Sequence, residues 1–219
     1  MTWLRSALFT GAFFLTTAVM AIVGSPLLLF ASETLTMGYA RLWSRVALLL
    51  LRTLAGVRVE IRGTANIPRG AALVAAKHQS AFETFALFPI LVAPTMIMKA
   101  ELRRIPLFGR FSELAGMIEV DRSKGGTALR DMIQRCRQEV AKGRQIVIFP
   151  EGTRRPPGAE PAYQPGIALL YKSLDVPTVP VALNSGLYWP RRSFVKHPGT
   201  IVIEFLPPVE AGLDSRTFL

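Results

Sequence analysis

An uncharged, apolar stretch near the N-terminus constrains this chain more than any other feature. No charged side chain occurs in residues 6–32, and a helix of that length can cross the hydrocarbon core of a bilayer. Gly24 and Pro26 lie near the end of the stretch, where proline kinks or stops a helix. We therefore expect an apolar helix that is interrupted near these residues and associates with a membrane.

The residues that follow leave the mode of association open. Residues 37–57 read as an amphipathic helix, which favours a helix lying on a membrane, although an ordinary packing helix shows the same pattern. A cleaved signal peptide, a spanning anchor and a hairpin or surface insertion all remain possible for residues 6–32. Arginines flank the stretch on both sides, so the positive-inside rule does not orient it. The arginine face is Arg41, Arg45 and Arg52, the apolar face is Leu42, Val46, Leu49 and Leu50, and Trp43 is expected at the interface.

The composition indicates an anionic partner. Of the 219 residues, 50% are hydrophobic and 19% are charged, and the net charge is +11. A chain that is both apolar and basic suits an anionic membrane surface, an anionic substrate, or both. Nucleic acid is disfavoured, because the phenylalanines lie in apolar runs and not among arginines and lysines, as a stacking surface requires.

Cysteine and histidine usage excludes several kinds of site. The single cysteine, Cys136, cannot form an internal disulfide and fits a reducing compartment. It falls on the apolar side of a predicted helix, so we expect it in the core. Two histidines and one cysteine are too few for the usual zinc sites, and no phosphate-binding glycine motif is present. We expect neither a metal nor a cofactor.

From residue 57 onward, short β-branched runs alternate with helical patterns. This alternation predicts an α/β domain with a mainly parallel sheet flanked by helices over residues 57–219, preceded by a membrane-associated helical segment at residues 1–56. In such folds ligands bind beyond the carboxyl ends of the strands. The expected strands are residues 57–62, 71–76, 95–98, 117–120, 145–149, 178–183 and 201–206, and the expected helices are 80–92, 127–142 and 166–174.

The stretch KHQSAFET, residues 77–84, places a histidine directly after a predicted buried strand. On a straight helix five residues turn through about 500°, so His78 and Glu83 would face different sides. Ser80 and Glu83 fit the S-x-x-E capping box, which would begin a helix and leave His78 outside it. His78 can then fold back, so that Glu83 accepts a hydrogen bond from one imidazole nitrogen and leaves the other as a base. The alternative is that Glu83 is only a helix cap and His78 a loop residue.

No protein nucleophile accompanies this pair. Ser80 is too close to His78 in the sequence to reach it without strain, and the chain has no G-x-S-x-G elbow. A base without a nucleophile indicates that a hydroxyl of the substrate attacks.

Three further polar clusters lie beside predicted strands. FPEGTR, residues 149–154, follows the most apolar strand and offers a glycine for close approach and an arginine for phosphate. VDRSKGG, residues 120–126, puts Arg122 and Lys124 at a helix N-terminus, where anions are favoured. KAELRRIPLFG, residues 99–109, begins just past another strand. Each cluster could instead be a surface turn or a plain basic loop.

Taken together, KHQSAFET, KAELRRIPLFG, FPEGTR and VPTVPVALNSG have the order and spacing of the glycerolipid acyltransferases. Over residues 57–209 the chain resembles this family, and within it most resembles the bacterial 1-acylglycerol-3-phosphate O-acyltransferases. The apolar N-terminus is similar to the membrane-docking helices of that family. Four motifs in register make the resemblance specific.

The resemblance implies roles for individual residues. His78 would be the general base, and Glu83 would orient it from a position where the family usually has aspartate, with one methylene more to accommodate. Lys99, Leu102, Pro106 and Gly109 match the second motif. The implied substrate-binding residues are Lys99, Arg122, Glu151, Gly152, Thr153 and Arg154, with Arg154 at a phosphate, and the implied structural or acyl-site residues are Pro106, Gly109 and Pro180.

The resemblance also implies a reaction and a location. A fatty acyl group would move from acyl-CoA or acyl-carrier protein to the free sn-2 hydroxyl of lysophosphatidic acid, giving phosphatidic acid. Lys99 or a backbone N–H would stabilise the oxyanion. The partners would be membrane lipid, lysophosphatidic acid and the acyl donor, at a bacterial inner membrane with the active site facing the cytoplasm. Another lysolipid or a lyso-aminolipid is an alternative acceptor, and a non-catalytic membrane-binding protein is an alternative of a different class.

Overall fold

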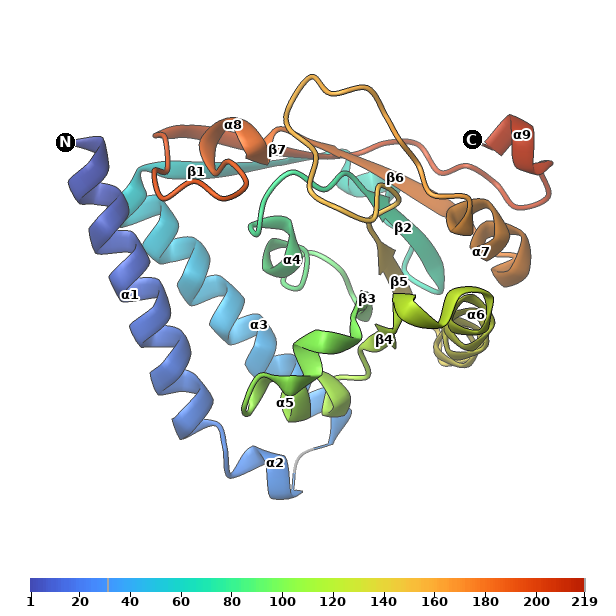
Figure 1. Ribbon diagram of the computed structural model, residues 1–219, viewed down its shortest axis with the longest axis horizontal. Helices are drawn as coiled ribbons and strands as arrows, with labels where there is room; N and C mark the ends of the chain where they lie inside the picture. The colour runs from blue at the N-terminus through green and yellow to red at the C-terminus, as the bar shows by residue number, and fades with distance from the viewer. Residues whose placement is uncertain (31, 219) are drawn as a thin grey trace.

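A seven-stranded sheet forms the centre of the protein, with the strand order β1-β7-β6-β2-β5-β3-β4 (Figure 1). The computed structural model describes residues 1–30 and 32–218, so Ala31 of the uncharged stretch lies outside the described residues. β6 and β7 pair antiparallel and the other neighbouring strands pair parallel, which confirms the predicted mainly parallel sheet. The strands are β1 (Val57–Arg62), β2 (Ala72–Ala76), β3 (Pro94–Lys99), β4 (Ile118–Val120), β5 (Gln145–Ile148), β6 (Thr178–Leu183) and β7 (Gly199–Phe205).

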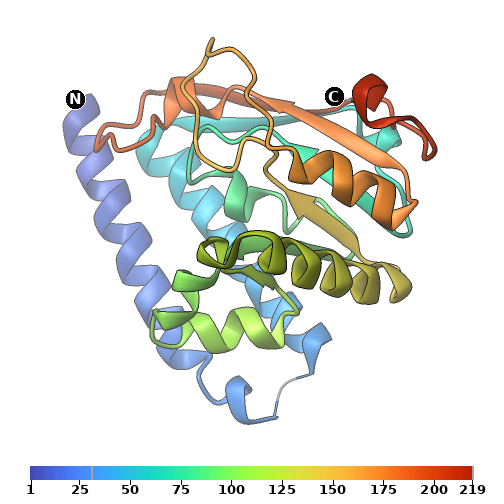
Figure 2. The same cartoon turned by 45° about the vertical axis from the view of Figure 1, so that its right-hand side comes forward.

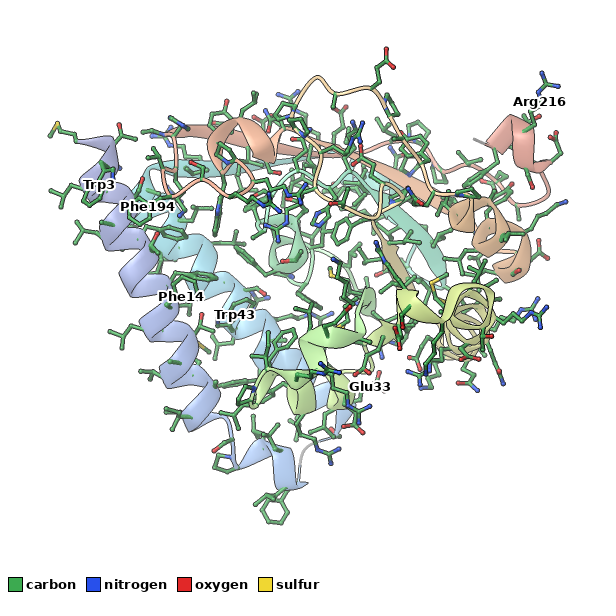
Figure 3. The ribbon with its side chains drawn as sticks, in the orientation of Figure 1. Trp3, Phe14, Glu33, Trp43, Phe194 and Arg216 are labelled. Atoms are coloured by element: carbon green, nitrogen blue, oxygen red, sulfur yellow. The ribbon has the colours of Figure 1, made fainter. Side chains whose placement is uncertain are left out.

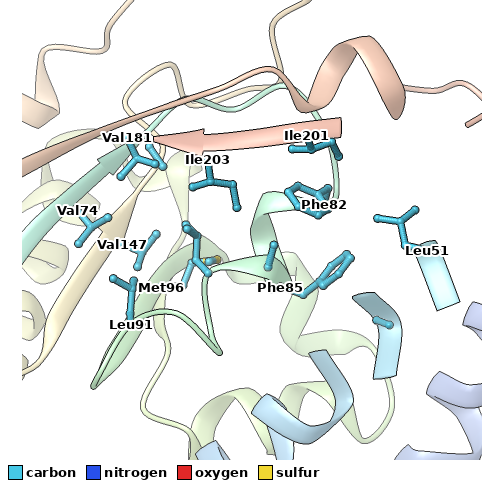
Figure 4. Packing of buried hydrophobic residues seen from close by; sticks show 14 of the residues in the cluster. Leu51, Val74, Phe82, Phe85, Leu91, Met96, Val147, Val181, Ile201 and Ile203 are labelled. Atoms are coloured by element: carbon cyan, nitrogen blue, oxygen red, sulfur yellow. The ribbon is translucent and has the colours of Figure 1, made fainter. Parts of the chain in front are cut away.

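Helices cover both faces of the sheet, and the alternation of side chains along the strands explains why. Leu73 and Ile146 point into a core beneath α6 and α7, whereas the next residues, Val74 and Val147, point into the larger core on the opposite face (Figures 2 and 4). Strands buried on both faces read as continuous apolar runs, as these do. The helices are α1 (Thr2–Val23), α2 (Leu27–Phe30), α3 (Glu33–Leu50), α4 (Glu83–Ala86), α5 (Phe108–Leu114), α6 (Gly125–Ala141), α7 (Gly166–Leu174), α8 (Ser185–Tyr188) and α9 (Ser215–Phe218).

Short turns of other helix types join these elements. Three are 3-10 turns, η2 (Thr64–Asn66), η3 (Ala100–Arg104) and η4 (Arg122–Lys124), and η1 (Leu51–Ala55) is a π-helical turn that carries α3 into β1. The predicted helix at residues 166–174 is confirmed as α7, and the one at 127–142 is confirmed as α6 with a start two residues earlier.

The N-terminal segment is a pair of long helices packed on one face of the sheet. α1 ends at Val23, next to the expected interruption, and α3 begins after Ser32, whose side chain accepts a hydrogen bond from the Leu35 N–H (3.3 Å). Figure 1 shows α1 and α3 side by side at one edge of the molecule. By length and composition, α1 is able to cross a membrane.

Two residues of α3 differ from their expected roles. Trp43, predicted at a membrane interface, packs instead between Phe13 of α1 and Phe85, and its indole N–H donates to Thr17 (3.1 Å). Arg41, on the predicted arginine face, donates to the carbonyls of Phe88 (3.1 Å), Leu91 (3.0 Å) and Val92. The interfacial position predicted for Trp43 was wrong, and both contacts agree with the alternative of an ordinary packing helix. Periodicity identifies a polar or apolar side of a helix but not the element that packs against it.

The helix predicted at residues 80–92 was wrong in extent, because only α4 forms, and bends and turns follow it. Pro89 lacks an N–H and disfavours helical geometry in the residue before it. The predicted capping box is also incomplete. Glu83 reaches back to the Ser80 N–H (2.7 Å), but the Ser80 hydroxyl accepts from Phe82 (3.2 Å) and α4 begins later, after Phe82.

Arg144 joins the N-terminal helices to the sheet from a buried position. Its guanidinium donates to the carboxylates of Glu33 (2.6 Å) and Glu139 (3.0 Å), which belong to α3 and α6. It also donates to the carbonyls of Pro94 (2.6 Å) and Ala115 (2.9 Å). Figure 3 labels Glu33, the first residue of α3, beside α5. Because the side chain is 5% exposed, little water can replace these bonds.

We expect Arg144→Ala to lower the free energy of unfolding by about 3 kcal/mol, because it leaves buried acceptors without a donor. Guanidinium unfolding of the detergent-solubilised protein measures the change. Arg130→Ala, on the exposed side of α6, is the matched control and should change stability by less than about 0.5 kcal/mol. Equal midpoints for the two variants would contradict the assigned role of Arg144.

Candidate active site

The carboxyl ends of the parallel strands bring the predicted site residues to one edge of the sheet. His78 follows β2, Lys99 ends β3, and residues 149–154 follow β5, which lies between those two strands. Ligand sites in open parallel sheets form at this edge. His78, Lys99, Gly152, Thr153 and Arg154 together line one pocket of approximately 270 Å³.

His78 contacts Glu83, as the sequence predicted. His78 Nδ1 lies 3.0 Å from Glu83 Oε1, and the side chain of Glu83 is fully buried. Glu83 also accepts hydrogen bonds from the backbone N–H groups of Gln79 (2.5 Å) and Ser80 (2.7 Å) and from the Ser185 hydroxyl (2.8 Å). Four donors on one side chain suit an ionised carboxylate, whose oxygens only accept. Nδ1–H therefore donates to Glu83, and the Nε2 lone pair is left as a proton acceptor.

A second carboxylate and an aromatic ring hold His78 in place. Glu151 accepts a hydrogen bond from the His78 N–H (3.1 Å), and the Arg155 N–H donates to the His78 carbonyl (2.8 Å). The imidazole stacks on Phe149, with ring centroids 4.2 Å apart and an angle of 17° between the rings. The loop after β5 therefore fixes both the backbone and the ring of His78.

Glu151 does not occupy the place expected of a substrate-binding residue. Its side chain is fully buried and does not line the pocket, and its other oxygen lies 3.6 Å from Lys77 Nζ. That oxygen has no hydrogen-bond partner in the described part of the chain. The sequence placed Glu151 at a strand end correctly, but a strand end has a side facing the pocket and a side facing the core.

Some of the predicted anion-binding residues line the pocket, and one instead stabilises the backbone of the loop that lines it. Lys99, Thr153 and Arg154 line the pocket, whereas Arg122 does not line it and donates to the Gly152 carbonyl (2.8 Å). Gly152 has φ = 66°, a conformation that favours glycine, and it turns the chain between the buried Glu151 and the pocket.

The remaining motif residues lie outside the pocket. Leu102 and Pro106 are exposed, and Gly109 is buried in α5, where a Cβ atom would come within 2.0 Å of the Arg103 carbonyl oxygen. Glycine is therefore required for α5 to pack on η3. Pro180 lies within β6, and its carbonyl accepts from the Leu206 N–H (2.9 Å) just after β7 ends. Gly109 and Pro180 therefore have structural roles in the packing of α5 and in the pairing of β6.

Sequence reasoning missed four residues of the site. Ser185 supports Glu83, and the side-chain oxygen of Gln79 accepts from the Gly186 N–H (3.0 Å), so both tie β2 to the end of β6. Arg191 and Arg192 line the pocket with Lys99 and Arg154. A signal was present, because Asn184-Ser185 and the Arg191-Arg192 pair follow a predicted strand, where sites of this fold form.

The arrangement can remove a proton from a hydroxyl of an anionic molecule. His78 is oriented by a buried carboxylate and lines a pocket together with lysine and arginine side chains. Within residues 1–30 and 32–218, no serine, threonine or cysteine side chain hydrogen-bonds to His78. The nucleophile that such a base would activate must therefore come from the bound molecule.

Comparisons with known proteins identify the family of this chain. A family model described as Acyltransferase matches residues 58–184. A 1-acyl-sn-glycerol-3-phosphate acyltransferase of Pseudomonas aeruginosa is 37% identical over 169 residues, which are 77% of this chain and 66% of that protein. The human protein named 1-acyl-sn-glycerol-3-phosphate acyltransferase alpha is 31% identical over 170 residues, which are 75% of this chain and 59% of that protein. The chain thus spans less than two thirds of the length of these relatives.

A solved structure shows the same fold. The crystal structure of the 1-acyl-sn-glycerophosphate (LPA) acyltransferase PlsC from Thermotoga maritima superposes with a TM-score of 0.74. The likeness covers 96% of this chain and 88% of that chain at 23% identity. The similarity includes nearly all of this chain, so the pair of N-terminal helices belongs to the shared fold.

We expect Glu83→Gln to lower the turnover number for acyl transfer by about 100-fold or more, with a small change in KM. The amide can still accept from Gln79 and Ser80 but cannot stabilise the imidazolium that forms when His78 takes a proton. Steady-state kinetics measure the change, and Glu113→Gln on the surface of α5 is the matched control. A Glu83→Gln protein with unchanged turnover would remove Glu83 from the reaction.

Proposed function

Because the chain belongs to the Acyltransferase family, we propose that it moves a fatty acyl group from a thioester to the sn-2 hydroxyl of lysophosphatidic acid. One observation carries the proposal, namely that His78, paired through Nδ1 with the buried Glu83, lines a pocket together with lysine and arginine side chains. Two relatives whose names state this acceptor, from Pseudomonas aeruginosa and human, support it.

In the proposed reaction, His78 acts as the general base. Its Nε2 atom takes the proton of the acceptor hydroxyl while the hydroxyl oxygen attacks the thioester carbonyl carbon. The new C–O bond forms, the C–S bond breaks, and the imidazolium returns the proton to the departing thiolate. Glu83 stabilises the imidazolium through the 3.0 Å contact to Nδ1.

The acceptor phosphate would bind to Arg154 and Lys99. A phosphomonoester carries up to two negative charges at neutral pH, and an arginine fork matches the geometry of its oxygens. Both side chains line the pocket that contains His78, so one bound molecule could place its phosphate on them and its hydroxyl at Nε2. Arg122 would act indirectly, by holding the Gly152 carbonyl beside Arg154.

The glutamate at position 83 does not favour a different acceptor. Its side chain is fully buried and makes its contacts with His78, two backbone N–H groups and Ser185. Glu83 therefore makes no contact with a molecule bound in the pocket. A lysolipid or lyso-aminolipid without a phosphomonoester would leave Arg154 without a role, and Arg154→Ala would then change acceptor affinity little.

We also infer that the protein docks on a membrane surface through α1 and α2. The outward sides of these helices expose large apolar side chains, among them Phe14, Leu15, Ile22 and Phe30. The inward side of α1 packs on the catalytic domain through the buried Phe9. A spanning α1 would have to leave these contacts, whereas a helix lying in the interface keeps them. The net charge of +11 favours an anionic leaflet, as at the cytoplasmic face of a bacterial inner membrane.

The first experiment compares wild type with His78→Ala in detergent micelles containing lysophosphatidic acid and radiolabelled acyl-CoA. We expect phosphatidic acid from wild type and about 10³-fold less from the variant. The same assay with acyl-carrier protein and with other lysolipids tests the alternative donors and acceptors. Equal product from both proteins would contradict the role of His78, and a role for the chain as a non-catalytic membrane protein predicts no product at all.

A protease-protection experiment tests the docked arrangement. In sealed inverted vesicles, a tag before Met1 should be cleaved together with a tag after Leu219, because docking leaves both on one side of the bilayer. Vesicles opened with detergent give the control for complete cleavage. Protection of the N-terminal tag alone would indicate that α1 spans the membrane.

A further inference from the structure

The pocket around His78 holds more positive charge than one phosphate requires. Four cationic side chains line it, Lys99, Arg154, Arg191 and Arg192. Within the described residues, no carboxylate lies within 4 Å of any of the four charged groups. Like charges gathered without counter-charges repel one another, so the cluster favours anionic ligands. If the acceptor phosphate binds to Lys99 and Arg154, then Arg191 and Arg192 remain without an anionic ligand.

The two remaining arginines come from the other side of His78. The sheet order places β2, which precedes His78, between β6 on one side and β5 and β3 on the other. Lys99 ends β3, whereas the arginine pair follows β6 and α8. β6 and β3 are three positions apart, so their ends are separated by roughly 14 Å. The cations therefore come from chain segments on both sides of β2, an arrangement that suits two anionic substrates.

The segment that carries the arginine pair, residues 189–197, is held by α1. Trp189 packs edge-on against Phe9, with ring centroids 5.2 Å apart, and Phe194 packs against Trp3, also at 5.2 Å (Figure 3). The buried Lys196 donates to the Thr10 hydroxyl (3.1 Å). These contacts fix the segment before any ligand arrives, which lowers the entropy cost of binding.

The arginines themselves are held in an unusual backbone. Arg192 has φ = 61°, a conformation that costs a residue other than glycine energy and that occurs at ligand clamps. Arg191 donates from one guanidinium nitrogen to the Arg154 carbonyl (3.0 Å), which joins its loop to the loop after β5. In the described part of the chain, the guanidinium of Arg192 has neither a hydrogen bond nor a salt bridge.

We propose that Arg191 and Arg192 form a subsite for a phosphate of the acyl donor. The ligand class is a thioester of a phosphorylated pantetheine, the chemistry that acyl-CoA and acyl-carrier protein share. The subsite rests on the proposed function, because it assigns the second substrate of the same reaction. It places the donor carrier beside β6 and the acceptor phosphate beside β3, with Nε2 of His78 between them.

Kinetics with both substrates varied test the assignment. Arg191→Ala/Arg192→Ala should raise KM for acyl-CoA by about 10- to 100-fold, since each charge-assisted hydrogen bond contributes about a tenfold effect or more. KM for the lysolipid should change far less in that variant and should rise instead in Arg154→Ala. Arg130→Ala/Arg135→Ala removes the same charge from α6 and should leave both constants near wild type. A rise confined to the lysolipid KM would overturn the proposal.

One further variant separates lost charge from a damaged loop. Glycine adopts positive φ without strain, so Arg192→Gly removes the guanidinium while permitting the same backbone. It should show a raised donor KM with the thermal unfolding midpoint of wild type. A normal donor KM in Arg192→Gly, together with a defect in the alanine variant, would show that the loop and not the charge matters.

Equilibrium binding separates this subsite from the proposed reaction. Coenzyme A and 4′-phosphopantetheine should bind to the wild-type protein but not to Arg191→Ala/Arg192→Ala. Pantetheine, which lacks the phosphate, should bind to neither protein. Tighter binding of coenzyme A than of 4′-phosphopantetheine would identify coenzyme A as the source of the phosphate, and equal binding would identify the shared 4′-phosphate. Equal binding of pantetheine and 4′-phosphopantetheine to wild type would overturn the subsite. Binding without any acyl transfer would overturn the proposed function alone.

Discussion

The site depends on a carboxylate that is removed from water. Glu83 is fully buried, and it is stable there because four donors surround it, one imidazole, two backbone N–H groups and the hydroxyl of Ser185. These donors come from the loop after β2 and from the end of β6. The carboxylate therefore orients His78 and joins two neighbouring strands at the same time, so the chemistry and the framework share one set of bonds.

Local patterns were enough to predict most of the fold. Each of the seven strands lies at a predicted run. The central strands read as short apolar segments between turns because they are buried on both faces, whereas the edge strand β1 alternates apolar and charged residues. The contact between His78 and Glu83 could also be predicted, since the two residues are five positions apart and the stretch between them specifies the turn. The extent of the helix after it could not, because Pro89 outweighed the apolar periodicity of residues 80–92.

The remaining parts of the site depend on which strands become neighbours. The sequence indicates where β6 ends but not that it lies beside β2, so Ser185 and Arg191 could not be placed next to His78. The resemblance assigned Glu151 to substrate binding, yet its side chain points inward to the backbone of His78. Trp43 was misplaced for a related reason, since its partners Phe13 and Phe85 come from other helices.

The packing of α1 against residues 189–197 has a consequence for folding during translation. The Lys196 N–H donates to the Ser6 hydroxyl (2.9 Å) across 190 positions of sequence, and the aromatic contacts of residues 189 and 194 reach the same helix. A ribosome releases α1 well before the segment against which it packs. During synthesis the apolar side chains of α1 are therefore exposed until the later strands have folded. A bilayer close to the exit tunnel would bury them during that time.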